Sequence, residues 1–238
     1  MSKKLHYQPS YRRNLPHIQP EGAIFFVTTR LHGSLPEAAL QRLQAEREQR
    51  RKIIELSAGP DDIKRAQLYD EDKRAFGRYD ALLDAASDGP VWLSDPRVAK
   101  LVCEAIHYRH GDLFDLIAYC VMPNHAHLVF TPRPGADKSY FALAEIMHGF
   151  KGYTGWKANE LLGLREHFWQ HESYDHYVRD GRELARIIDY VLWNPVKAGL
   201  TDSWEKWPWS YWCGVEGKRK PRSANRRVCR AKEKTQSA

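Results

Sequence analysis

Two strand-like segments joined by a very short turn constrain the fold of this chain more than any other feature. Residues 114–122 and 125–131 are rich in β-branched and aromatic side chains, and Pro123 and Asn124 separate them. So short a turn places consecutive strands side by side in opposite directions, because a parallel pair needs a long crossover. The chain is therefore expected to contain an antiparallel sheet.

Other segments supply further strands and the helices. Residues 22–30 and 168–178 have strand-like composition, and 204–212 is an aromatic-rich return segment. Helical periodicity or helix-start signals mark residues 36–58, 61–86, a segment opening at Asp95-Pro96, a segment that follows 137–139 and stops at Gly163, and 181–194. This order indicates an α+β fold, with helices packed on an antiparallel sheet in an arrangement close to the split β-α-β motif.

Charge and cysteine content limit the classes of partner and compartment. The 238 residues carry 37 Lys and Arg against 30 Asp and Glu, a net charge of +7, which suits a polyanion but does not require one. Four scattered cysteines without Cys-x-x-Cys spacing favour reduced thiols and a cytoplasmic protein. No segment reaches the roughly 20 apolar residues of a membrane span, and the N-terminus lacks the apolar run of a signal peptide.

The second strand of the predicted hairpin contains two histidines spaced two residues apart. Side chains at this spacing project from one face of a strand, so His125 and His127 lie together while Ala126 and Leu128 point to the core. Two adjacent imidazoles can bind a metal ion once an oxygen or amide ligand joins them. Because they point away from the apolar face, replacing both by Ala is expected to leave the fold nearly unaltered. The alternative is a pair of half-exposed histidines without a metal.

The helix predicted over residues 181–194 carries a second set of candidate groups. Beside its apolar stripe, Tyr190 and Asn194 lie one turn apart, with Glu183 on the same face. A phenol is a poor nucleophile while protonated, and a nearby divalent cation helps the phenolate form. Pro195 disfavours helical geometry at the preceding residue, so we expect the helix to end or kink at Asn194.

Several motifs in the same order resemble those of the REP-associated tyrosine transposases. These proteins belong to the HUH single-strand endonucleases, which are named for two histidines flanking a hydrophobic residue. The resemblance covers roughly residues 8–32 and 90–212. It is carried by residues 121–130, with the His125-Ala126-His127 motif, by 188–200, with Tyr190 and Asn194, and by 207–210, and it extends to 168–170 and 174–180.

The resemblance implies a ferredoxin-like antiparallel sheet flanked by helices, with a helical insertion at about 36–88 after the first strand. Composition, rather than the resemblance, indicates a basic arm (1–21) before the transposase domain (22–215) and a basic tail (216–238), expected to be disordered, after it. His125, His127 and Asn194 would bind Mg²⁺ or Mn²⁺. Tyr190 would attack a phosphate of single-stranded or hairpin DNA, giving a 5′-phosphotyrosine and a free 3′-hydroxyl, in a monomer or a homodimer.

Other residues are alternative candidates for the nucleophile or the metal ligand, or candidate DNA contacts. Tyr153 is the second candidate nucleophile, and Tyr174 and Tyr177 are more typical of packing or stacking. Asp175 could reach the metal but reads more simply as a solvated carboxylate. The candidate DNA contacts are basic residues and tryptophans that could stack on unpaired bases: Arg12, Arg13, Lys151, Lys157, Arg179, Lys197, Trp156, Trp169, Trp193 and Trp209.

Two other functions remain open from the sequence. The first is a catalytically silent DNA- or RNA-binding protein on the same scaffold, such as a domesticated transposase, which need not keep Tyr190, His125 and His127 together. The second is a hydrolytic metal enzyme that uses the two histidines and a water nucleophile, which would leave no covalent protein–DNA product.

Overall fold

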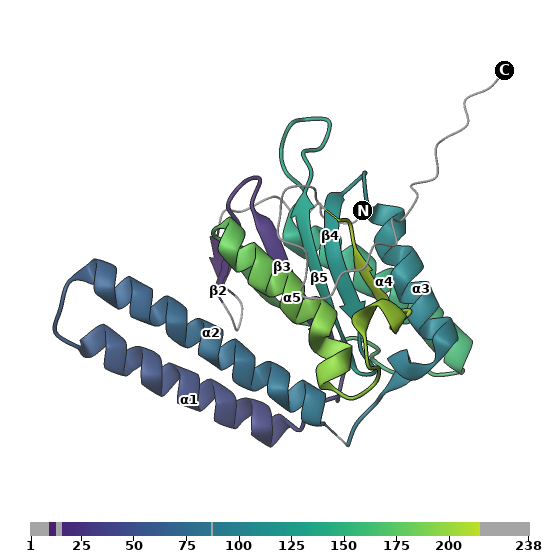
Figure 1. The fold of residues 1–238 in the computed structure, drawn as a ribbon, viewed down its shortest axis with the longest axis horizontal. Coiled ribbons are helices and arrows are strands. Elements are labelled where there is room, and N and C mark those ends of the chain that lie inside the picture. Colours follow the sequence, from purple (N-terminus) through teal and green to yellow (C-terminus); the bar gives the residue numbers. More distant parts are fainter. Residues whose placement is uncertain (1–9, 13–15, 87, 215–238) are drawn as a thin grey trace.

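The computed structural model of this protein describes residues 10–12, 16–86 and 88–214 (Figure 1). In these ranges the elements run in the order β1 (Ser10–Arg12), β2 (Pro16–Ile18), β3 (Ile24–Arg30), α1 (Glu37–Leu56), α2 (Asp61–Ala85), the 3-10 helix η1 (Trp92–Ser94), α3 (Pro96–Arg109), β4 (Phe114–Val121), β5 (His125–Pro132), α4 (Leu143–Leu162), β6 (Tyr174–Val178), α5 (Gly181–Lys197), η2 (Trp204–Lys206) and β7 (Ser210–Trp212).

The centre of the described chain is a five-stranded sheet with the order β6-β3-β5-β4-β7, and each neighbouring pair is antiparallel. The predicted hairpin is its middle, since β4 and β5 pair directly. β1 and β2 form a separate antiparallel pair. The prediction of an antiparallel sheet flanked by helices is confirmed.

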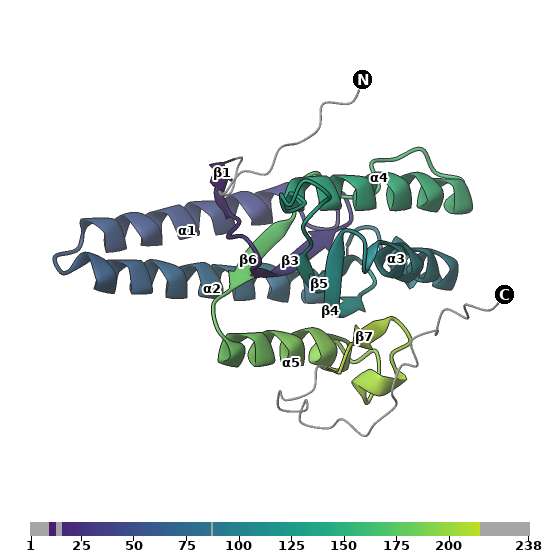
Figure 2. The same cartoon turned by 90° about the horizontal axis from the view of Figure 1, so that it is seen from above.

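Helices cover both faces of this sheet (Figure 2). On one face, α3 and α4 pack against a large apolar core that includes Ala126, Leu128 and Phe130 of β5. On the other face, α5 packs against a smaller core to which β5 contributes Val129. The histidines lie on this second face, which is therefore a buried interface rather than a polar surface.

α1 and α2 form a helical hairpin that extends past the edge of the sheet (Figures 1 and 2). Arg47 and Arg51 of α1 each lie 2.9 Å from the carboxylate of Asp72 on α2 and hold the two helices together. α1, whose residues are all described, buries none of its side chains, whereas α2 buries Glu71, Asp80 and Leu83. The hairpin is thus attached to the sheet chiefly through α2.

Two helix boundaries differ from the predicted ones. α4 begins at Leu143 rather than just after residues 137–139, because Asp137 accepts hydrogen bonds from the amide and hydroxyl of Ser139 and closes a local turn instead. α5 continues through Pro195 to Lys197, so the expectation that the helix ends at Asn194 is wrong. Pro195 falls in the last turn, where it removes one amide donor and leaves the earlier turns intact.

Among the described residues, no helix is long and apolar enough to cross a membrane. Among the described residues, Cys103, Cys120 and Cys213 form no disulfide, and the first two are buried. Cys229, Arg13 and the predicted tail lie outside the described residues.

Candidate metal and tyrosine site

α5 places two candidate residues above the sheet. It begins where the carboxylate of Asp180 accepts hydrogen bonds from the backbone amides of Arg182 and Glu183. Its apolar stripe is buried against the sheet, which turns Tyr190 and Asn194 toward β5. Because Tyr190 and Asn194 are one helical turn apart, the phenol and the amide both lie next to β5, as the sequence predicts.

Both histidines of β5 meet this face, and both are 0% exposed. Their Nε2 atoms lie 3.0 Å apart. Nδ1 of His125 lies 2.6 Å from Oδ1 of Asn124, and Nδ1 of His127 lies 2.8 Å from Oγ1 of Thr28. Because the amide of Asn124 donates to the carbonyl oxygen of Leu83, its Oδ1 is the acceptor and His125 is protonated at Nδ1.

The histidines are held neutral, with their Nε2 atoms facing each other. Burial lowers the pKa of His125 to about 3. Burial also lowers the pKa of His127 well below its ordinary value, and the charges of His125 and Lys197 lower it further. A neutral imidazole that donates from Nδ1 presents a lone pair at Nε2, the form in which histidine binds metals.

A carboxylate that the sequence did not point to joins these nitrogens. Oδ1 of Asp80, on α2, lies 3.4 Å from Nε2 of His127, and the ligand atoms of Asp80, His125 and His127 lie within 4.8 Å of one another. Nδ2 of Asn194 lies 2.9 Å from the same Nε2. Burial, reinforced by the carboxylate of Asp84, raises the pKa of Asp80 to about 8.

Two buried oxygens test whether these residues fit a metal ion. In the described part of the chain, neither Oδ1 of Asp80 nor Oδ1 of Asn194 has a hydrogen-bond partner. Turning the Asn194 amide over would exchange its nitrogen and oxygen beside His127. A buried oxygen without a donor is costly, and a divalent cation accepts both imidazole nitrogen and carboxylate oxygen. The donor set therefore fits such an ion.

Tyr190 stands next to this cluster. Its ring centroid lies 5.6 Å from that of His127, and its hydroxyl oxygen is buried without a hydrogen-bond partner among the described residues. Phe26 and Phe76 contact its ring edge-on, while Nζ of Lys197 lies 4.3 Å from the ring centre. A phenol, two imidazoles, an amide and a cation are thus brought together from α5 and β5.

A family model and two relatives show what this chain is similar to. The model described as "Transposase IS200 like" matches residues 95–193. A REP-associated tyrosine transposase of Haemophilus influenzae is 28% identical over 116 residues, or 47% of this chain and 62% of that protein. That of Escherichia coli K12 is 29% identical over 97 residues, or 41% and 53%. The resemblance to the REP-associated tyrosine transposases is confirmed.

This chain spans 62% and 53% of the length of those two transposases. A solved structure of a REP-associated tyrosine transposase bound to a REP hairpin matches 95% of this chain and 98% of that one, with 18% identity and a TM-score of 0.46. The segment matched by the transposase family model contains Tyr190 and both histidines, and it ends before Asn194.

The rival tyrosines lie elsewhere or are engaged. Tyr153 is on α4, across the sheet from the histidines, where it is 44% exposed and lies beside the guanidinium of Arg109. The ring of Tyr174 stacks on Phe76 with centroids 4.3 Å apart, and Tyr177 packs against the larger core. Tyr190 alone of the four meets the histidine pair among the described rings.

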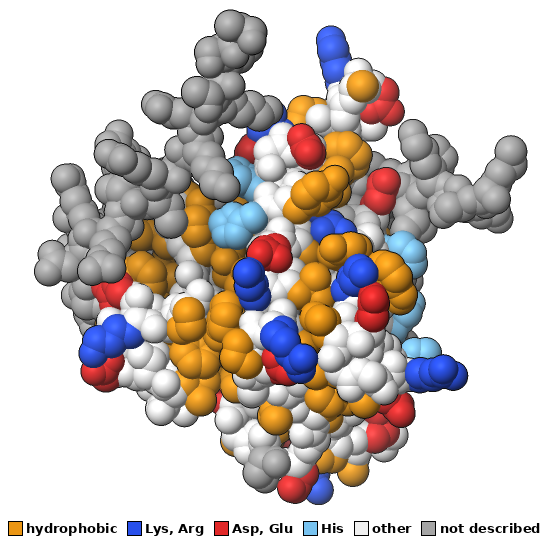
Figure 3. Space-filling model, turned by 90° about the vertical axis from the view of Figure 1, so that its right-hand side faces the viewer, with side chains coloured by type: hydrophobic (Ala, Val, Ile, Leu, Met, Phe, Trp, Pro, Cys, Tyr) orange, Lys and Arg blue, Asp and Glu red, His pale blue; other side chains and the backbone are white. Residues whose placement is uncertain are grey.

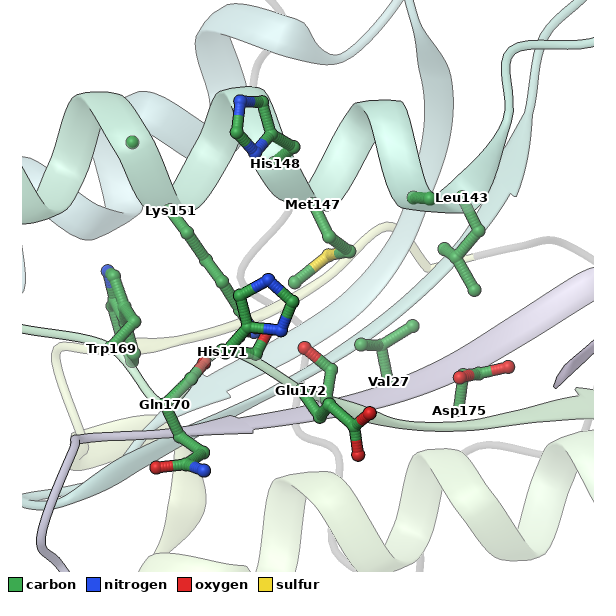
Figure 4. Close-up of a pocket in the computed structure, with 13 residues that line it drawn as sticks. Val27, Leu143, Met147, His148, Lys151, Trp169, Gln170, His171, Glu172 and Asp175 are labelled. Atoms are coloured by element: carbon green, nitrogen blue, oxygen red, sulfur yellow. Dashed lines mark hydrogen bonds between the residues drawn. The ribbon is translucent and has the colours of Figure 1, made fainter. Parts of the chain in front are cut away.

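Lys151, a predicted DNA contact, and Asp175, a possible metal ligand, instead line a cavity of about 270 Å³ on the α4 face (Figure 4). The amine of Lys151 points from α4 to the carbonyl oxygens of Gln170 and His171. Neither residue belongs to the histidine cluster.

The other predicted DNA contacts are spread over the surface. Arg179 is exposed over the ring of Tyr69, Lys157 pairs with Glu160, and Lys197 lies beside Tyr190. Arg12 ends β1, and its side chain, like all of Arg13, lies outside what the structure describes. Among these described side chains, that of Lys197 contacts a residue of the site, and those of Arg179 and Lys157 contact other residues.

The four tryptophans differ in exposure. Trp156 is 61% exposed with Nζ of Lys157 4.3 Å from its ring centre, whereas Trp169 is 7% exposed and donates to Oγ1 of Thr154. Trp193 and Trp209 are half-buried. One side of the molecule shows apolar side chains interspersed with basic, acidic and histidine side chains (Figure 3). Of the four, Trp156 best retains a ring face for stacking.

The structure corrects one expectation and adds one residue. Both histidines are fully buried under α2 and α5, so the premise that they face away from any buried surface is wrong, and we expect their replacement to cost stability. Asp80 was missed because α2 reads as a uniformly charged helix. The available signal was that Asp80 and Asp84 lie one turn apart beside Leu83, which places two carboxylates at the edge of an apolar contact.

Proposed function

We propose that this protein is a tyrosine transposase that cuts single-stranded DNA next to a hairpin and becomes covalently attached to it. The main support for this proposal is the position of Tyr190, whose ring lies against His127 and next to the amine of Lys197. The names of the two transposase relatives support the activity, and the solved hairpin complex of a similar protein suggests the kind of DNA.

The proposed reaction is a transesterification. The phenol oxygen of Tyr190 forms a bond to phosphorus, and the bond from phosphorus to the 3′-oxygen breaks. The phenol loses its proton and the leaving 3′-oxygen gains one, so the products are a 5′-phosphotyrosine and a free 3′-hydroxyl. No water or oxidant is consumed, and the energy of the phosphodiester is retained for rejoining.

In this proposal His125, His127 and Asn194 hold Mg²⁺ or Mn²⁺, which supplies Lewis-acid polarisation of the phosphate. The chain's own groups do the rest. Thr28 and Asn124 fix the two imidazoles through their Nδ1 atoms. Lys197 offers a positive charge beside the phenol, where it would stabilise a phenolate or a phosphate.

DNA can reach this site only after one of the helices that cover it, α2 or α5, moves. The two histidines are 0% exposed and the hydroxyl oxygen of Tyr190 is buried, so a phosphate cannot contact them while both helices cover them. Lys197 at the site, together with Arg179 and exposed rings such as Trp156 outside it, would bind the DNA backbone and its unpaired bases.

The test is whether protein and DNA become covalently joined. Purified protein is incubated with a 5′- or 3′-labelled single-stranded hairpin and Mn²⁺, and the products are separated on a denaturing gel. We expect a protein-linked band containing the DNA 3′ of the cut, and none with Tyr190→Phe, which lacks the attacking oxygen.

Tyr153→Phe is the matched control and should give the band at the wild-type level. Loss of the band in Tyr153→Phe with retention in Tyr190→Phe would transfer the nucleophile to α4. Cleavage without any protein-linked DNA would favour a hydrolytic enzyme that uses water. Hairpin binding with no cleavage would favour a silent DNA-binding protein.

A further inference from the structure

The helix that covers the site also contributes to it. Asp80 comes from α2, outside the segment that the transposase family model matches. Asp80 is 2% exposed, and its Oδ1 lies 3.4 Å from Nε2 of His127. Of the atoms that the structure describes, none donates a hydrogen bond to this oxygen. A carboxylate in this position is arranged as a ligand rather than as part of a completed ion pair.

A second contact ties α2 to the same histidines. The carbonyl oxygen of Leu83 accepts from Nδ2 of Asn124 at 2.9 Å, and Oδ1 of Asn124 lies 2.6 Å from Nδ1 of His125. This chain of hydrogen bonds sets the tautomer that leaves Nε2 of His125 free to bind. The side chain of Asp84, 26% exposed, lies 4.0 Å from that Nε2.

Elsewhere the hairpin is held through α2, where Tyr69 and Lys73 bind Glu183 of α5 and Phe76 stacks on Tyr174. α1, described in full, buries no side chain. A cavity of about 240 Å³, lined among others by Arg30, Phe76, Tyr79 and Tyr174, separates the hairpin from the sheet edge. Any group that binds both Asp80 and the histidines would add a further attachment of α2 to the sheet.

We propose that Asp80 is a further ligand of the metal site, supplied by α2, so that a bound divalent cation fastens the α1–α2 hairpin over Tyr190. This proposal rests on the metal site of the proposed function and adds to it a ligand and a coupling. The cation would be held by imidazole nitrogens of the sheet and a carboxylate of the hairpin. Its binding and the closing of the hairpin then become one equilibrium.

The experiment measures Mn²⁺ binding to the full chain without DNA, by calorimetry. Asp80→Asn keeps the shape of the side chain and removes the charged oxygen, and we expect its Mn²⁺ affinity to fall at least tenfold. Asp70→Asn, which removes an exposed carboxylate from the same helix, is the matched control and should bind like wild type. Asp80→Glu, which keeps a carboxylate, should retain more affinity than Asp80→Asn.

Amide hydrogen exchange supplies the second measurement. Mn²⁺ should slow exchange along α2 in the wild type and in Asp70→Asn, and should leave it unchanged in Asp80→Asn. Circular dichroism of each variant confirms that it is folded. Equal Mn²⁺ affinity in Asp80→Asn and Asp70→Asn, or equal protection of α2, would overturn the proposal.

Failure of this proposal is distinguishable from failure of the proposed function. If His125→Ala with His127→Ala loses Mn²⁺ binding while Asp80→Asn keeps it, the histidine site stands and Asp80 is no ligand. If Mn²⁺ binds none of these proteins, or all of them equally, the histidine site itself is wrong.

Discussion

Two buried carboxylates lie on the same side of the sheet, and they differ in how they are paired. Glu183, 3% exposed, accepts hydrogen bonds from the hydroxyl of Tyr69 and the amide of Arg179. It also lies 3.3 Å from both Nζ of Lys73 and Nε2 of His176. Asp80, 2% exposed, faces neutral histidines and keeps an oxygen without a donor among the described residues.

The pKa values follow this difference. Burial alone would raise the pKa of Glu183, but the hydrogen bonds from Tyr69 and Arg179 and the nearby cations bring it to about 2. Burial and Asp84 raise the pKa of Asp80 to about 8. The Glu183 cluster thus has its partners within the chain and joins α2 to α5. The Asp80 cluster has Lys197 nearby, but its charge does not offset the burial of Asp80. A buried carboxylate left in this condition is expected at a site that binds a metal ion.

The largest expected effect is a loss of DNA cleavage when the Asp80 cluster, but not the Glu183 cluster, is disrupted. Replacing His125 and His127 together by Ala should lower DNA cleavage by roughly a hundredfold or more, because several kcal/mol of Lewis-acid stabilisation is lost. Since both rings are buried, the variant should also lose about 1–3 kcal/mol of stability. Initial cleavage rates and thermal melts at one Mn²⁺ concentration measure the two effects.

His176→Ala is the control for that variant, because His176 belongs to the Glu183 cluster. It should lose stability while cleaving at close to the wild-type rate. The comparison breaks if the double variant still cleaves in EDTA, or if His176→Ala loses cleavage as severely as the double variant does.

The next effect is on stability alone. Glu183→Gln removes the charge that pairs with Lys73 and accepts from Tyr69, so we expect the free energy of unfolding to fall by about 2–3 kcal/mol. For a chain of this size that corresponds to a melting temperature lower by about 4–12 °C. Mn²⁺ affinity, measured by calorimetry, should stay at the wild-type value. A large loss of Mn²⁺ affinity would show that the two clusters are not separate.

The smallest effect is a difference in pH dependence. The pKa of Asp80 is raised in the folded protein, so its contribution to stability is full below its ordinary pKa of 3.8 and is lost as pH rises through about 8. Metal-free wild type should lose about 2 kcal/mol between pH 6.5 and 8, and Asp80→Asn should lose little. Histidine titration does not intrude, because the lowered pKa of His125 costs stability only below pH 6.5.

Glu183 should show the opposite sign. Its pKa is lowered, so its contribution is present above the ordinary value of 4.5 and is lost as pH falls through about 2. Urea titrations in EDTA across this range measure both slopes. An identical slope for wild type and Asp80→Asn above pH 6.5 would contradict the assignment of the unpaired carboxylate to Asp80.

Much of this molecule follows from local patterns. The short turn at Pro123 and Asn124 predicts the central strand pair, because it leaves no room for a crossover. The spacing of His125 and His127 predicts a shared strand face, and that of Tyr190 and Asn194 a shared helix face. These inferences are confirmed as geometry because they depend on the periods of a strand and a helix, which hold wherever the element lies. Their chemical roles stay predictions.

Other features depend on which elements meet. The second face of the sheet could not be recognised as buried from β5 alone, since α5 and α2 cover it. Asp80 lies 45 residues before His125 in the numbering of the chain, and nothing in the charged pattern of α2 shows which of its carboxylates turns toward the sheet. Asp80 becomes buried only when segments distant in the sequence pack together and exclude water. Its unpaired oxygen and its shifted pKa follow from that burial, so they cannot be predicted from the sequence of one segment.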